Sequence, residues 1–212
     1  MADQITVIAS GNLASAQRTI AGLLGQLFFL GVSDEDALEL ITNAGLPPRA
    51  LEEPDFPISL EQELIICMAL VRRFGGDRSA VRMFFQSMRK IGIENLGVLG
   101  MAMRHAPTAV AALQVCFNFP QLTWGHSRLV VSRQSNASLF TYTMQRPQIR
   151  GASTADIDAL VQYCLALDLV TSLRNIQDIV GLQAAPLYIT FPFRQPDDWH
   201  LVQEALPCPV EF

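Results

Sequence analysis

Five of the seven residues best suited to recognising a small molecule lie in or beside a predicted β-hairpin, and Tyr163 and Tyr188 are the other two. They combine amphipathic rings with guanidinium groups, which a mostly apolar pocket uses to orient a ligand that carries a carboxylate or another polar end. Aromatic residues of strands also commonly pack a core, and hairpin arginines commonly face water. Seven residues are therefore candidate ligand contacts: Trp124, His126, Arg128, Tyr142, Arg146, Tyr163 and Tyr188.

The spacing of the histidines and cysteines does not favour a metal site or a nucleophilic catalyst. His105, His126 and His200 lie about twenty or more residues apart, without the local pairs that zinc sites use. The four cysteines form no Cys-x-x-Cys motif and are interpreted as buried thiols of a reducing compartment: Cys67, Cys116, Cys164 and Cys208. The nucleophile elbow, the phosphate loop and the dinucleotide fingerprint are all missing from the sequence. We expect no metal, no cofactor and no catalytic residue.

One acid differs from the rest. Most acids lie at predicted helix starts, where they cap the helix and oppose its dipole, but Asp168 lies inside an apolar run. We interpret it as a partly buried partner of an arginine rather than a catalyst. The alternative is a small hydrolase-like enzyme acting on an apolar acid or ester, with Asp168 or His126 as base, although the sequence offers no group that would orient that base.

Composition narrows the class of protein. The 212 residues are 50% hydrophobic and 17% charged, enough for a full core but poorer in charge than the roughly 25% of typical domains. Mean hydropathy is +0.26, so we expect apolar surface to be hidden in a partner or a pocket. The net charge of −5 argues against direct binding of nucleic acid. No apolar run reaches the roughly 18 residues of a membrane span, and no secretory signal is present, so we expect a cytoplasmic protein.

Apolar periodicity predicts helices in the first half of the chain. The expected helices cover residues 13–30, 34–45, 59–75 and 78–90, with a proline-rich extended connection between the second and third. Capping-box spacings at Ser33–Asp36 and Ser59–Gln62 mark two of the starts. Residues 34–63 hold nine acids and one base, and residues 72–104 hold seven bases and two acids, so the two segments could face each other or a partner.

The second half mixes strands and helices. We expect a buried, glycine-punctuated strand at 91–103, a helix from Thr108 to Pro120, and a hairpin of 127–134 and 137–145. A long helix from Ser153 to about Ile179, a strand at 187–191, a short helix at 197–206 and an extended end at 209–212 follow. The predicted fold class is α+β: a helical N-terminal half, about 13–90, packed on a small mostly antiparallel sheet with a long crossover helix, about 91–212.

Several of these segments resemble one known family. The run from Glu94 to Met103, the Ala106-Pro107-Thr108 turn, the strand Leu187–Phe191 and the close Cys208–Phe212 are similar to the effector domain of AraC/XylS-type transcription regulators, in the ornithine-utilisation branch of its arabinose-binding-like domains. These motifs are hydrophobic and glycine positions that specify a fold and name no ligand.

The resemblance implies a regulator rather than an enzyme. Residues 1–212 would form a single effector-sensing and dimerisation domain that binds a small-molecule effector of unknown class and has no membrane partner. It would be a homodimer that reaches DNA only through a C-terminal helix-turn-helix domain absent from this chain. A pocketless protein-interaction module, using the acidic and basic segments, is the remaining alternative.

Overall fold

The computed structural model describes most of the chain. The described residues are 18–75, 92–119, 127–134, 137–181, 185–201, 203, 206 and 208–212. The predicted helix at 78–90, the hairpin turn at 135–136, Trp124 and His126 lie outside them. Within them the protein is α+β, as predicted, and the helices are α1 (Ala21–Leu30), α2 (Asp34–Asn43), α3 (Leu60–Gly75), α5 (Gly97–Arg104), α6 (Ala109–Asn118) and α7 (Thr154–Val180).

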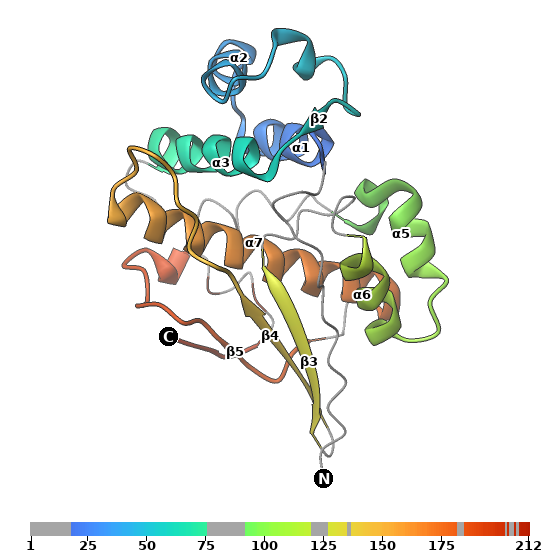
Figure 1. The fold of residues 1–212 in the computed structure, drawn as a ribbon. Coiled ribbons are helices and arrows are strands. Elements are labelled where there is room, and N and C mark those ends of the chain that lie inside the picture. Colours follow the sequence, from blue (N-terminus) through green and yellow to red (C-terminus); the bar gives the residue numbers. More distant parts are fainter. Residues whose placement is uncertain are drawn as a thin grey trace.

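The N-terminal half places α1 and α3 in one layer, with α2 outside it (Figure 1). The capping boxes explain where the helices begin. The Ser33 hydroxyl accepts the Asp36 N–H at 3.2 Å, and Ser59 and Gln62 exchange bonds of 3.0 and 3.1 Å. Gly31 ends α1 with a left-handed φ of 70°, a conformation that glycine adopts without steric cost.

Two expectations in this half were wrong. Arg18–Thr19 is a short strand, β1, antiparallel to β2 (Pro57–Ile58), so the first helix begins at Ala21. Strand pairing to β2 overrides the apolar periodicity there. The proline-rich connection is not extended throughout, because Pro48–Leu51 forms the 3-10 helix η2, whose first turn tolerates proline.

The expected strand at 91–103 is helical instead. Its described part forms the 3-10 helix η3 (Ile93–Leu96) followed by α5, with Leu99, Gly100 and Met103 buried and Met101 exposed, which is helical spacing. An ideal Cβ placed on Gly100 would lie 2.0 Å from the Ile93 carbonyl oxygen. The glycine therefore permits close packing of a helix on the preceding turn, not the close approach of a strand. The helix predicted from Thr108 is present as α6, and the Thr108 hydroxyl caps it by accepting the Ala111 N–H at 3.1 Å.

In the described ranges the strands form three separate pairs rather than one sheet. β3 (Arg128–Gln134) and β4 (Ala137–Thr143) make the predicted hairpin, with Arg128 opposite Thr143 and Gln134 opposite Ala137. β5 (Ile189–Thr190) pairs in parallel with β6 (Val210–Glu211). The long helix therefore connects two pairs and does not cross over a single sheet. Of the helix predicted at 197–206, part lies outside the described residues, and Trp199–Leu201 forms the 3-10 helix η5. Trp199 packs there in an aromatic group with Phe191 and Phe212.

The long helix α7 is the centre of the molecule. It runs between the α1–α3 layer and the hairpin, with α5 and α6 beside its C-terminal end (Figure 1). Residues 163–168 are all buried, as expected for a helix covered on every side. The predicted capping box is present, since the Ser153 hydroxyl accepts the Asp156 N–H and the Asp156 carboxylate accepts the Ser153 N–H at 2.9 Å.

Two apolar clusters share α7. The first joins α1, α2, α3, the N-terminal part of α7 and the C-terminal strands. The second is smaller and consists of Ile93, Leu99, Met103, Ala112 and Leu113, with Phe140, Tyr142, Ile176 and Ile179 packed against it. In the part of the chain that the structure describes, no helix combines the length and the apolarity needed to cross a bilayer.

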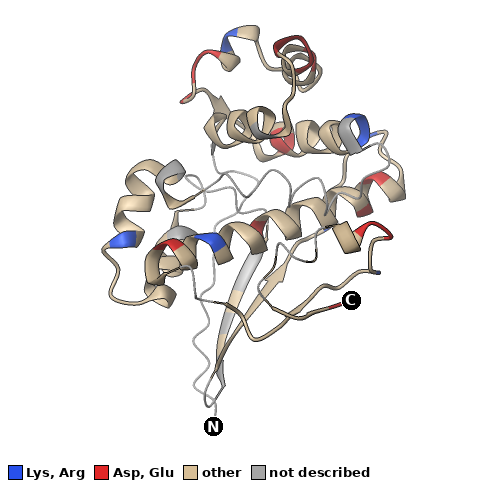
Figure 2. Cartoon of the chain, turned by 180° about the vertical axis from the view of Figure 1, so that it is seen from behind, with Lys and Arg blue, Asp and Glu red and all other residues tan. Residues whose placement is uncertain are grey.

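The acidic and basic segments face each other in part. Asp and Glu residues, drawn in red, lie on α2 and in the loop after it (Figure 2). Arg73 of α3 forms ion pairs with Asp36 and Glu39 of α2. The neighbouring Arg72 turns to α7 and pairs with Asp156 at 2.6 Å. Consecutive arginines thus link α3 to two different helices.

Candidate functional site

Two of the predicted ligand contacts belong to the hairpin but to opposite faces of it. Tyr142 of β4 stands opposite Leu129, and Arg128 is the next residue along β3 from Leu129, so its position belongs to the other face. Tyr142 is half-buried and packs against the second apolar cluster with Phe140. Trp124 and His126 precede this strand in the chain but lie outside the described residues.

The other predicted contacts lie apart. Arg146 follows β4, is exposed and forms an ion pair with Asp158 of α7. Tyr188 is 57% exposed and comes just before β5. Tyr163 is completely buried among the helices of the N-terminal half. A single site cannot include all seven residues, and of those that the structure describes Tyr142 is the one that packs with the C-terminal part of α7.

A buried joint fixes the start of the hairpin on α7. Asp168, which is 5% exposed, accepts the Ser127 N–H at 2.8 Å and the Ser127 hydroxyl proton at 2.6 Å. Ser127 is itself buried and directly precedes β3. The expected burial of Asp168 is confirmed, while the arginine expected beside it stays a prediction. Because both bonds converge on one carboxylate oxygen, the position of Arg128 depends directly on α7.

The joint belongs to a polar face of α7. Ser172 and Asn175 are buried and follow Asp168 at spacings of four and three residues, which places all three on one side of the helix. Ile176 and Ile179, next along the helix, pack with Tyr142 in the second cluster. A few buried polar groups beside apolar and aromatic ones are typical of small-molecule sites. We name these three residues of α7, together with Ser127 that is bonded to Asp168, the polar face.

Sequence reasoning missed Ser127, Ser172 and Asn175. The signal for the last two was the helical spacing from Asp168, which becomes informative only when the helix is known to be buried on that side. Ser127 carried no signal, because its contact with Asp168 spans 41 residues.

The two ends of α7 are fixed by charged groups. At the N-terminal end, bonds from Arg72 at 2.6 and 2.7 Å and those from Ser153 hold the pKa of Asp156 well below its usual range. Near the C-terminal end, Asp178 accepts the backbone N–H of Ile93 at 2.9 Å, which attaches η3 to α7. The polar face therefore lies on a helix that contacts both halves of the molecule.

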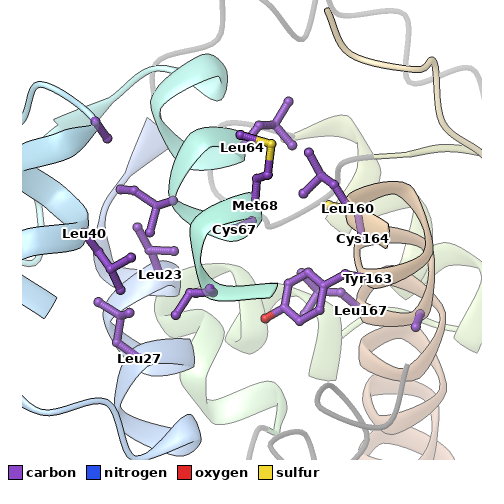
Figure 3. Close-up of a cluster of buried hydrophobic side chains, with 14 of the residues drawn as sticks. Leu23, Leu27, Leu40, Leu64, Cys67, Met68, Leu160, Tyr163, Cys164 and Leu167 are labelled. Carbon is purple, nitrogen blue, oxygen red and sulfur yellow. The ribbon is translucent and has the colours of Figure 1, made fainter. Parts of the chain in front are cut away.

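A second buried polar pair joins α7 to α1. The Tyr163 hydroxyl donates to Gln26 Oε1 at 2.9 Å, and Figure 3 shows the ring reaching from α7 among the leucines and cysteines of the helical core. Burial, and after it the nearby Cys67, Cys164 and Glu63, hold the pKa of Tyr163 well above its usual range. The hydroxyl therefore keeps its proton and acts as a donor.

Among the described residues, no group of three or more His, Cys, Asp or Glu side chains is arranged to hold a metal ion. The polar face offers hydrogen-bonding groups and one carboxylate that binds Ser127. Groups of this kind can form hydrogen bonds with a bound molecule.

Comparison with known families agrees with this chemistry. The model of the arabinose-binding domain found at the N-terminus of AraC transcription regulators matches residues 35–212, which is most of the chain. The protein belongs to this family of ligand-sensing regulatory domains. A search of curated proteins gave no match to the sequence.

Proposed function

We propose that this domain binds a small-molecule effector between the hairpin and α7, forms a homodimer, and controls DNA binding by a separate unit of an AraC-type regulator. The observation that carries the proposal is the Asp168–Ser127 joint, because it connects the hairpin that holds the candidate contacts to the central helix. The family membership supports the regulatory role.

Regulation follows if the effector prefers one of two conformations. A ligand shifts such an equilibrium only by its difference in affinity for the two states. An effector held by Tyr142 between the hairpin and α7 would favour one position of the hairpin relative to α7. Since α7 also contacts α3 and η3, a shift at the hairpin would be felt at both ends of the helix.

A thermal-shift screen tests effector binding. Amino acids, aromatic acids, fatty acids and sugars are added to the purified domain, because a ligand that binds only the folded state raises Tm by mass action. We expect a concentration-dependent rise with one chemical class. The Tyr142→Ala variant should lose this rise, while Tyr188→Ala, which changes an exposed tyrosine elsewhere, should keep it.

Sedimentation of the same samples tests dimerisation. We expect a species of twice the chain mass whose stability changes when the effector is added. A well-folded monomer that responds to no compound would contradict the proposal.

A further inference from the structure

The junction of α1, α3 and α7 contains polar groups that the hairpin site does not use. Gln26 of α1, Glu63 of α3 and Tyr163 of α7 are 1%, 3% and 0% exposed, and each comes from a different helix. They lie within the largest apolar cluster, where polar groups are retained only if they are hydrogen-bonded.

One of these groups is a donor without an acceptor in the described structure. Gln26 Oε1 accepts the Tyr163 hydroxyl proton, but Gln26 Nε2 has no hydrogen-bond partner. A buried donor left unpaired is costly, so such an atom in a folded protein calls for an explanation. Exchanging the amide oxygen and nitrogen would not remove the problem, because the oxygen would then be buried without a donor.

From this geometry we propose that the helical junction binds an uncharged, mainly apolar small molecule whose oxygen atom accepts a hydrogen bond from Gln26 Nε2. This site is separate from the hairpin site and goes beyond the proposed function.

The surroundings define the chemical class of the ligand. Figure 3 shows Leu23 and Leu27 on the α1 side and Leu160 and Leu167 on the α7 side of the Tyr163 ring, so the body of the ligand is apolar. The Nε2 amide can only donate, so the ligand group is an acceptor. Glu63 is close enough to act electrostatically on Tyr163, and an anionic ligand would bring a second negative charge beside it. An alcohol or a ketone fits these conditions, and a carboxylate does not.

Four six-carbon probes test the class. 1-Hexanol, 2-hexanone, hexanoate and hexylamine are titrated at pH 7 into the domain, and the side-chain amide signals of Gln26 are followed by ¹⁵N NMR. We expect 1-hexanol and 2-hexanone to shift these signals, and hexanoate to bind at least about tenfold more weakly than 2-hexanone. Hexanoate or hexylamine binding as tightly as the neutral probes would overturn the proposed class.

Two variants test the residue. Gln26→Leu removes the donor and should weaken 2-hexanone binding by about fivefold or more, whereas Gln145→Leu, the same change at an exposed glutamine outside the junction, should bind as the parent does. Equal binding by Gln26→Leu and the parent would overturn the site. So would Gln26 signals in the parent that respond to neither neutral probe, a result that needs no variant to fold and that would assign the donor to an internal water.

Discussion

Asp168 combines two roles that are separable by substitution. Its carboxylate satisfies two buried donors of Ser127, and it stands on the face of α7 that the candidate hairpin contacts approach. Removing the carboxylate leaves the Ser127 hydroxyl and N–H buried without an acceptor. The loss of stability is then the desolvation penalty of these two donors, which exceeds the net contribution of one hydrogen bond.

We expect Asp168→Ala to lower the free energy of unfolding by about 1–3 kcal/mol in urea denaturation. Asp158→Ala, on the same helix, removes only an exposed ion pair to Arg146 and should change stability by less than about 1 kcal/mol. Equal losses of stability in the two variants would show that the Asp168–Ser127 hydrogen bonds contribute no more than an exposed ion pair.

The pH dependence of stability should identify Asp156. Its folded-state pKa is lowered by Arg72 and Ser153, so the stability it contributes is complete above the unfolded pKa of about 3.9 and is lost as the pH falls toward the folded value. Urea midpoints at pH 6, 4 and 3 should therefore converge for the parent and Asp156→Asn as the pH falls. A gap between the two that stays constant with pH would contradict the linkage.

At the scale of elements, Gly100 inside α5 decides how closely this helix packs on η3. Gly100→Ala places a Cβ against the backbone oxygen of Ile93, which cannot rotate away as a side chain would. We expect a loss of about 1–3 kcal/mol from overpacking, measured by urea denaturation. Ala102→Ser, on the exposed side of α5, should be close to neutral.

The same elements show which features the sequence predicts well. Helix starts at Ser33, Ser59, Thr108 and Ser153 are local, because the cap and its partner lie three residues apart, and all four were correct. The segment at 91–103 was wrong because its glycines and apolar residues fit either a strand or a closely packed helix, and only the contact with Ile93 distinguishes them.

The candidate site was less predictable than the elements. The residue types of the hairpin pointed to recognition, but the joint between Ser127 and Asp168 and the pair of Gln26 and Tyr163 span 41 and 137 residues. Contacts at such separations follow from tertiary packing, for which one sequence carries no periodic signal.

At the scale of the whole molecule, α7 makes the two apolar clusters depend on each other. Leu167 is completely buried in the first cluster, while Ile176 and Ile179 of the same helix pack in the second. We expect Leu167→Ala to cost about 2–5 kcal/mol and to accelerate amide hydrogen exchange in both α3 and α6. Acceleration confined to α3 would show that the halves open independently.

The cysteines differ in burial, so the rates at which they are alkylated report how often the helical core opens. Cys67 and Cys164 are completely buried in the helical junction, whereas Cys208 is only partly covered. An alkylating reagent should modify Cys208 before Cys67 and Cys164, which it reaches only when α3 and α7 separate. The labelling rates of Cys67 and Cys164, followed peptide by peptide, therefore measure transient opening of the helical core, and a molecule that occupies the junction should slow them without altering the rate at Cys208.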